Sequence, residues 1–253
     1  MPAPARLLDL TRLVSRLGRG PLTGVDRVEY AYLRHLLAEA TPLFGLARTA
    51  LGFVLLDRAG AGAIAARANG DPLGRPDLLS RLTHRHNPAR ARAESDLRRF
   101  ALARTHRLGL GQMLRRHLPA GTTYLNTGHA NLSPRVMRAA HAAGGRIAVL
   151  VHDTIPLDHP EFTRPGIPAV FARKLACIAA HADLVIHSAT ATRALTETHF
   201  ARLGRTPPGV TAPLGLDLRQ PETPPARAPY FVTIGTIEPR KNQALLLNVW
   251  QRL

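Results

Sequence analysis

The feature that most constrains the fold is a regular alternation of short apolar runs with longer segments of helical spacing. Apolar runs typical of buried strands occupy residues 122–126, 146–151, 182–186 and 210–214. Helical spacing occupies the intervening residues 134–143, 168–181 and 190–200. Strands that alternate with crossover helices pair in parallel. The order therefore predicts an α/β fold with a mostly parallel, doubly wound, Rossmann-like sheet.

The N-terminal residues predict a further unit of this kind. Residues 7–14 suit a first strand, and glycines mark a turn over 18–24. A helix follows, with Val25, Val28, Tyr32 and Leu36 on one face, and Thr23 with Asp26 resembles a capping box at its start. The G-x-G-x-x-G fingerprint of dinucleotide sites is absent, so the sequence does not favour a nicotinamide cofactor.

The segments that join these units have weaker patterns. Residues 51–67 predict two short strands around a glycine-rich turn. Residues 71–80 and 154–168 are rich in proline and predict loops. Residues 81–118 form the most basic segment of the chain and are rich in arginine. They predict either a solvated helix pair that covers the sheet or an amphipathic helix that faces a membrane.

Polar residues follow three of the predicted strands directly. His129 lies in the loop after residues 122–126, His152 and Asp153 come straight after 146–151, and Ser188 ends the next strand. The carboxyl ends of parallel strands meet at one edge of a sheet, and ligands gather there. We therefore expect these side chains to line one cleft, with His152 and Asp153 in catalytic roles.

A second candidate site lies near the C-terminal end. The run YFVTIGTIEPRKN over residues 230–242 predicts a buried strand, a turn and the start of a helix. Arg240 and Lys241 fall on that turn, where backbone N–H groups and the helix dipole favour an anion. A diphosphate site is one interpretation, and a solvated basic helix start is the other. A proline-rich stretch before it predicts a linker, with domains at 1–222 and 223–253.

Charge and cysteine content narrow the functional classes. The formal net charge is +17, yet the cations are nearly all arginine and aromatic residues are only 5%. No zinc-finger, helix-turn-helix or RNP pattern accompanies the charge, so nucleic acid is not the expected partner. The one cysteine, Cys177, excludes an internal disulfide, and we expect neither a secretory signal nor a membrane span. We expect a cytoplasmic protein. Its basic surface could also bind the anionic head groups of a membrane peripherally.

Metal binding is not expected. Cys177 and His181 lie four residues apart on a predicted helix, but no second pair of ligands accompanies them. His84 and His86 lack a partner at ligand spacing, so we expect both at the surface. No Asp-x-Asp motif occurs. We predict no metal and no cofactor.

Several motifs together resemble family 4 glycosyltransferases of the GT-B fold. They are GTIEPRKNQALLL, RIAVLVHDTIPLDHPEFTRPG and ADLVIHSATAT, and TGVDRVEYAYLRHL is similar to a subgroup that acts on bacterial surface polysaccharides. The resemblance covers nearly the whole chain, in the expected order. It implies an acceptor-side Rossmann-like domain followed by the beginning of a nucleotide-sugar domain, of which one strand and one helix are expected here.

The resemblance also implies an activity: transfer of a hexose, mannose as the first suggestion, from a nucleotide sugar to a hydroxyl of a glycan or lipid-linked acceptor, with retained configuration. His152 matches the family histidine beside the sugar. Lys241 matches the lysine that binds the donor diphosphate. Thr236 stands where the family arginine follows the glycine, so Arg240 is expected to replace it.

Gly24 is expected near the donor, and Arg27, His129 and Ser188 near the acceptor or the cleft. His152 and Lys241 are expected on facing walls of the cleft between the domains. A chain that ended at Leu253 would lack the rest of the nucleotide pocket and would have weak or no activity by itself. The alternative function is a basic module that binds nucleic acid or an anionic membrane. A nucleotide-sugar epimerase is a weaker third.

Overall fold

An eight-stranded sheet forms the centre of the computed structural model, which describes residues 3–215 and 230–252. The strands are β1 (Arg6–Asp9), β2 (Leu43–Thr49), β3 (Gly52–Leu56), β4 (Ala103–Thr105), β5 (Thr123–Asn126), β6 (Arg146–Val151), β7 (Leu184–His187) and β8 (Gly209–Thr211). Their order is β4-β3-β2-β1-β5-β6-β7-β8. In the order from β2 to β8 all neighbours are parallel, whereas β3 pairs antiparallel with both β2 and β4. The predicted α/β class with a mostly parallel, Rossmann-like sheet is confirmed.

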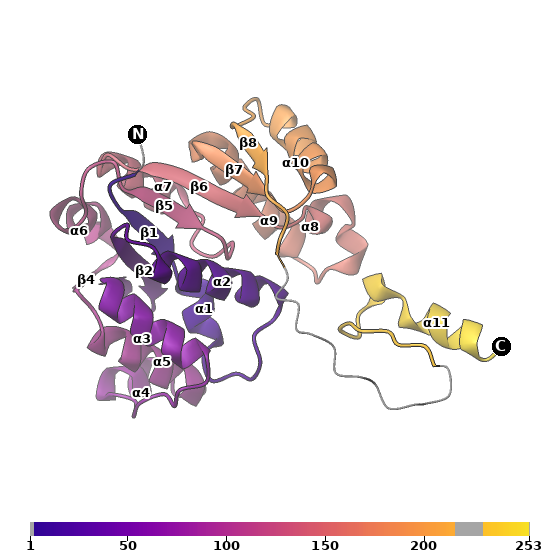
Figure 1. The fold of residues 1–253 in the computed structure, drawn as a ribbon, viewed down its shortest axis with the longest axis horizontal. Helices are drawn as coiled ribbons and strands as arrows, with labels where there is room; N and C mark the ends of the chain where they lie inside the picture. Colours follow the sequence, from indigo (N-terminus) through magenta and orange to yellow (C-terminus); the bar gives the residue numbers. More distant parts are fainter. Residues whose placement is uncertain (1–2, 216–229, 253) are drawn as a thin grey trace.

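Helices cover both faces of this sheet (Figure 1). The first group is α1 (Thr11–Arg16), α2 (Gly24–Ala38), α3 (Arg58–Ala68), α4 (Leu78–Thr83) and α5 (Pro88–Arg99). The second is α6 (Leu110–His117), α7 (Pro134–Ala142), α8 (Ile155–Asp158), α9 (Ile167–His181) and α10 (Thr190–Arg202). Shorter 3₁₀ turns are η1 (Arg107–Gly109), η2 (Pro160–Phe162) and η3 (Pro239–Lys241), and α11 (Gln243–Trp250) follows η3.

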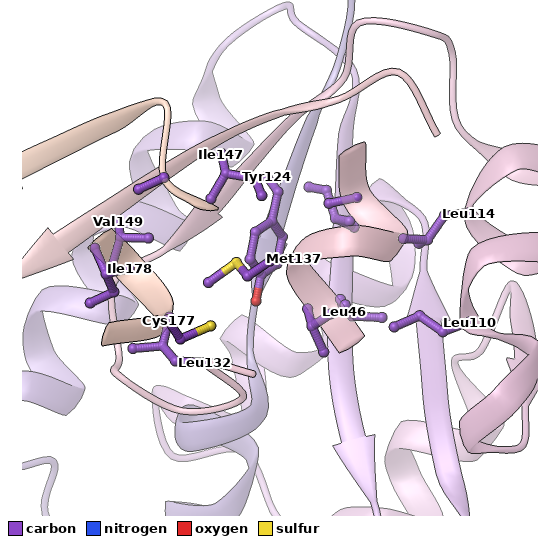
Figure 2. Close-up of a cluster of buried hydrophobic side chains, with 14 of the residues drawn as sticks. Leu46, Leu110, Leu114, Tyr124, Leu132, Met137, Ile147, Val149, Cys177 and Ile178 are labelled. Atoms are coloured by element: carbon purple, nitrogen blue, oxygen red, sulfur yellow. The ribbon is translucent and has the colours of Figure 1, made fainter. Parts of the chain in front are cut away.

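Two apolar cores lie on opposite faces because side chains alternate along a strand. Leu8 of β1 packs with side chains of α1, α2, α3 and α5. Leu7 of the same strand packs with side chains of α6, α7 and α9. In this second core the Tyr124 ring lies among Met137, Ile147 and neighbouring apolar side chains (Figure 2). Each fully buried leucine contributes about 1.5–3 kcal/mol relative to an exposed one.

The sheet reverses its direction of growth between β1 and β5. The chain leaves β1 to form β2 on one side, and β5 later pairs with the other side of β1. The loops after β1 and β5 therefore diverge to opposite faces. Such a topological switch point opens a crevice at the carboxyl ends of the strands, where ligands of open α/β sheets bind. This crevice positions the candidate site.

Several helix starts follow the predicted local chemistry. Thr23 and Asp26 form the predicted capping box at the start of α2. Pro134 occupies the first turn of α7, where a missing N–H is harmless. The buried face of α2 differs from the prediction, because Asp26, Glu29, Leu33 and Leu36 are the buried residues.

The predicted strand over residues 7–14 is wrong beyond Asp9. The Asp9 carboxylate accepts a hydrogen bond from the Thr11 backbone N–H at 3.0 Å, which turns the chain out of the sheet. α1 begins at Thr11, and its Leu13 and Val14 then pack into the core at helical spacing. A polar residue at the end of an apolar run therefore marked the boundary.

Three connecting segments are more helical than predicted. Within residues 51–67 only β3 is a strand, because the Asp57 side chain caps α3 by accepting from the Gly60 N–H at 2.8 Å. Asp77 caps α4 in the same way, so the predicted loop over 71–80 ends at Leu78. The predicted loop over 154–168 contains the short α8 and η2.

The arginine-rich residues 81–118 form neither one long amphipathic helix nor a fully solvated pair. They include the end of α4, then α5, β4, η1 and α6. α5 packs against α1 and α4, and it buries Glu94 and Asp96. These carboxylates pair with Arg67 on α3 and with Arg90 and Arg99 on α5, whereas most arginines of residues 81–118 have no ion pair among the described residues.

The C-terminal segment departs from the prediction at its start. Residues 230–234 form no strand, and the Phe231 and Ile234 side chains are 78% and 94% exposed. A strand needs a neighbour to pair with, and none of the described strands pairs with this stretch. The turn and helix after it do form, as η3 and α11. The predicted domain boundary at residue 222 lies outside the described residues.

Among the described residues, no helix is both long and apolar enough to cross a bilayer.

Candidate active site at the carboxyl edge of the sheet

The loops after β5 and β6 meet through two histidines. The ring centroids of His129 and His152 are 5.1 Å apart. Nε2 of His129 lies 2.8 Å from the Leu150 carbonyl oxygen in β6, and Nε2 of His152 lies 2.7 Å from the Thr127 carbonyl oxygen after β5. A carbonyl only accepts, so each Nε2 carries the proton. The predicted convergence of these two histidines is borne out by the geometry.

Both rings are neutral near pH 7. Burial lowers the pKa of His129 to about 3, and repulsion from His152 adds to the effect. Burial also lowers the pKa of His152, although the hydrogen bond to Thr127 acts in the opposite direction. In this tautomer the remaining nitrogen, Nδ1, has a free lone pair. His152 can therefore accept a hydrogen bond, for instance from a hydroxyl, at that atom.

Asp153 follows His152 in the chain, and Ser188 contacts the His152 backbone from the next strand. The Asp153 carboxylate accepts from the Ile155 backbone N–H at 3.2 Å, at the start of α8, and its charge favours protonation of His152. Ser188 donates its hydroxyl to the His152 carbonyl at 3.0 Å. Ser188 thus positions the backbone of His152 from the end of β7.

A buried polar network beneath the loop after β5 was not predicted. Asp9, at the end of β1, accepts hydrogen bonds from Tyr124 Oη and Asn131 Nδ2, both at 2.9 Å. Burial raises the pKa of Asp9, although the hydrogen bonds from Asn131, Thr11 and Tyr124 lower it. Asp9 joins β1, β5 and the loop across the switch point. The sequence signal was a single carboxylate that ends an apolar strand.

Glu29 lies close to this network on the buried face of α2. Its Oε1 accepts from the Leu13 backbone N–H at 3.3 Å, whereas Oε2 has no hydrogen-bond partner among the described residues. Burial raises the pKa of Glu29 well above its usual value, and the charge of Asp9 adds to the rise. Glu29 has helical spacing with Leu33 and Leu36, and this spacing was the sequence signal that its side chain is buried.

Arg12 connects α1 with α2. Its Nε lies 2.7 Å from Oδ1 of Asp26, and the Asp26 side chain is fully buried. Arg16, one turn later, approaches the other oxygen of Asp26 at 3.2 Å. This pairing fixes the start of α2 beside the end of β1.

A cleft of about 1180 Å³ opens next to His129. Its walls come from the residues after β1 and β2, from the loop after β5 with the start of α7, and from α9. Of the residues expected to line one cleft, only His129 does so, together with Arg12 and Lys174. His152, Asp153 and Ser188 are not among the residues that line it, so this part of the expectation is wrong. A volume of this size accommodates a ligand larger than a single sugar ring.

The other predicted site residues are not joined to the histidines. Gly24 and Arg27 are exposed at the start of α2, where Arg27 Nε donates to the Leu22 carbonyl, and neither lines the cleft. Thr236, Arg240 and Lys241 are exposed. No hydrogen bond or ion pair among the described residues links Lys241 with His152, so their expected juxtaposition stays a prediction.

The turn at Arg240 and Lys241 has local structure of its own. Arg240 pairs with Glu238 at 2.6 Å, and the Thr236 hydroxyl donates to the same carboxylate at 2.6 Å. Both residues of the basic pair lie in η3, directly before α11. This confirms the predicted turn before a helix, the position at which backbone N–H groups are available to an anion.

Among residues 3–215 and 230–252 no group of three or more metal-ligating side chains occurs. Cys177 is buried in the core that α9 forms with the sheet. The surface position expected for His84 is wrong. Its side chain is only 17% exposed, and its Nε2 lies 3.0 Å from Oε2 of the buried Glu94. His86 is exposed, as expected.

Comparison with known proteins supports a glycosyltransferase. The chain is similar to three proteins from Escherichia coli that are each described as the serotype-specific mannosyltransferase WbdA. The first is 32% identical over 148 residues, and the others are 31% identical over 146 residues. Each match covers 49% of this chain, but the chain spans only 17–18% of the length of these relatives. No family model and no solved structure matches the chain.

Proposed function

We propose that the chain belongs to a family 4 glycosyltransferase of the GT-B fold and supplies its acceptor-side lobe. The activity is the transfer of a hexose from a nucleotide sugar to a hydroxyl of a glycan or lipid-linked acceptor, and mannose is the first candidate for the hexose. The proposal includes retention of the anomeric configuration and a role in bacterial surface polysaccharide synthesis. The similarity to WbdA mannosyltransferases over half of the chain is the observation that carries it.

In this proposal His152 contacts the sugar. Its Nε2 proton is held by the Thr127 carbonyl, so Nδ1 accepts from a sugar hydroxyl and orients the ring at the reacting carbon. The Asp153 carboxylate favours protonation of the imidazole, and Ser188 holds the histidine backbone. His129 completes the wall of the site from the loop after β5.

The donor is bound through its diphosphate. Arg240 and Lys241, at the start of α11, are the proposed donors of charge-assisted hydrogen bonds to it, with Thr236 on the same turn. Gly24 and Arg27 at the exposed start of α2 are proposed to border the donor and the acceptor. Catalysis rests on positioning of the substrates and on stabilisation of the leaving diphosphate. The proposed location of the reaction is the cytoplasmic side of a membrane.

The test is a transfer assay with the complete chain. Labelled GDP-mannose and other nucleotide sugars are incubated with a mannosylated acceptor, and the configuration of the product is read by NMR. His152→Ala is expected to lower kcat/KM at least about tenfold, whereas the exposed His86→Ala serves as control. Lys241→Gln is expected to raise KM for the donor.

A basic binding module would give a different set of results. The chain would then transfer no sugar, and nucleoside diphosphates would leave its melting temperature unchanged. It would instead be retained on heparin or anionic vesicles until moderate salt releases it. That outcome replaces the transferase with a basic binding module.

A further inference from the structure

The cleft beside His129 has an unusual charge. Its walls carry seven cationic side chains: Arg12, Arg48, Arg90, Arg107, Arg135, Arg138 and Lys174. The acidic side chain that lines it is Glu94. Glu94 is already engaged, since Arg90 Nε lies 2.8 Å from its Oε1 and His84 approaches its Oε2. Asp26 engages Arg12.

The remaining cations have no ion-pair partner among the described residues. They are Arg48, Arg107, Arg135, Arg138 and Lys174. Lys174 is half-buried, and burial lowers its pKa, with further lowering by the charges of Arg12 and Arg48. Like charges held together at a concave surface raise the positive potential, which an anionic ligand relieves. The charge pattern therefore points to an anion of more than one negative charge.

The backbone at the floor of the cleft is strained and firmly held. His129 and Asn131 both have left-handed backbone angles, with φ of 55° and 59°. Asn126 Nδ2 fixes the turn between them by donating to the Ala130 carbonyl at 2.6 Å, and Asn131 is held by Asp9. Such strain persists where surrounding contacts determine it, and it concentrates at ligand sites.

The start of α7 adds to the positive field. Ser133 and Pro134 line the cleft, and the Ser133 side chain makes no capping hydrogen bond. The first N–H groups of this nine-residue helix thus lack a side-chain partner at the cap, and the helix dipole favours an anion there. Arg135 and Arg138 follow on the same helix, three residues apart and on one face.

We propose that this cleft binds a phosphate or diphosphate group of the acceptor. The inference rests on the proposed function and specifies its acceptor as a phosphorylated one. All the residues that line the cleft lie between Thr11 and Lys174. None comes from the turn at Arg240 and Lys241, which is assigned to the donor. The acceptor diphosphate is therefore held at the switch point, beside His129, while its sugar hydroxyl extends toward His152.

The test measures binding to the complete chain by calorimetry at low and at moderate salt. The ligands are inorganic pyrophosphate, geranyl diphosphate as a soluble lipid-linked diphosphate, GDP and a single-stranded oligonucleotide. The variants are Arg135→Gln and Arg138→Gln. Arg116→Gln is the matched control, because Arg116 is exposed on α6 and outside the cleft. Melting temperatures without ligand check that each variant is folded.

We expect pyrophosphate and geranyl diphosphate to bind, and each cleft variant to weaken them roughly tenfold or more while Arg116→Gln has no effect. A preference for geranyl diphosphate identifies a lipid-linked acceptor, and equal binding identifies the phosphate group alone. The proposal is overturned if the cleft variants weaken only GDP, if the oligonucleotide competes as well as pyrophosphate, or if no diphosphate binds. Sugar transfer to a neutral acceptor with no diphosphate binding would refute this inference and leave the proposed function intact. Diphosphate binding in the cleft without any sugar transfer would refute the proposed function and leave the diphosphate site intact.

Discussion

His129 and His152 each donate the Nε2 proton to a backbone carbonyl on the segment that carries the other. His129 reaches the Leu150 carbonyl in β6, and His152 reaches the Thr127 carbonyl after β5. The two loops are thereby tied together at the edge of the sheet, with the ring centroids 5.1 Å apart. This reciprocal pairing sets the position of both imidazoles before any ligand arrives.

The first prediction concerns the stability that this pairing provides. His129→Asn keeps a residue type that tolerates a left-handed backbone, but the shorter side chain cannot reach the Leu150 carbonyl. An unsatisfied buried carbonyl makes the variant less stable by about 1–3 kcal/mol. Thermal unfolding should show a decrease in Tm of several degrees. His86→Asn, at an exposed position, should leave Tm unchanged. An equal Tm for both variants would show that the pairing contributes nothing.

The second prediction is a dependence of stability on pH. The pKa of His129 is about 3 in the folded chain and about 6.5 when unfolded, so the unfolded state binds the proton first. The contribution is complete above pH 6.5 and is lost as pH falls from 6.5 toward 3. At pH 5 the loss is on the order of 2 kcal/mol. Denaturant titrations of the wild type and His129→Asn should therefore differ less at pH 5 than at pH 8. A constant difference would contradict this assignment.

How far the sequence predicts this arrangement depends on the range of the contacts involved. Buried strands such as β6 and helices such as α9 were predicted, because their patterns are local and long. The convergence of His129 and His152 followed from one further assumption, a parallel sheet. β2 was not predicted. Residues 7–14 were assigned to one strand, although the hydrogen bond from the Thr11 N–H to Asp9 turns the chain out of the sheet after Asp9.

The site beneath the histidines could not be predicted by the same reasoning. Asp9 and Tyr124 are 115 residues apart and meet only because β1 and β5 are neighbours. Glu29 belongs to the buried face of α2, which is set by packing against α1 and α3 and differs from the face that valine spacing suggests. Strand order fixes these contacts, and strand order is not a local property of the sequence.

The third prediction tests the buried carboxyl of Glu29. Its pKa is raised in the folded state, so its contribution to stability is present below pH 4.5 and is lost as pH rises through the folded pKa. Glu29→Gln removes the ionisation. The variant should gain stability relative to the wild type as pH increases from 4.5, with the largest gain at alkaline pH. Urea unfolding at a series of pH values measures the difference. A gain that is the same at every pH would exclude ionisation of Glu29 as its cause.

The fourth prediction compares two glycines. A Cβ on Gly128 would clash with Oε2 of Glu29 and lie 3.1 Å from the Cβ of Arg12, whereas one on Gly24 would have no neighbour within 4 Å. Gly128→Ala should therefore destabilise the chain by about 1–3 kcal/mol and displace the loop that carries His129. Gly24→Ala, in the first turn of α2, should be neutral or slightly stabilising. Chemical denaturation of both variants provides the comparison, and equal stabilities would show that the loop relaxes without cost.

The fifth prediction concerns the ionic packing of α5. The Asp96 carboxylate is 1% exposed and accepts from Arg67 Nε at 3.0 Å, Arg99 at 2.7 Å and the Gly74 N–H at 3.0 Å. Breaking a buried ion pair destabilises by about 3–5 kcal/mol when the remaining charge stays buried. Arg99 is 45% exposed and Arg67 can still reach Asp71, so part of that penalty is relieved.

Asp96→Ala should accordingly destabilise the chain by about 2–3 kcal/mol. Asp71→Ala is the matched control, because its carboxylate is 57% exposed and lies 3.7 Å from the same arginine. This control should change stability by less than about 0.5 kcal/mol. Urea denaturation at low and high salt separates the cases, since the loss at Asp96 should persist in high salt, where an exposed pair would be screened. If salt abolished the loss at Asp96, the carboxylate would be acting as a surface charge, and the buried cluster that anchors α5 to α3 would be refuted.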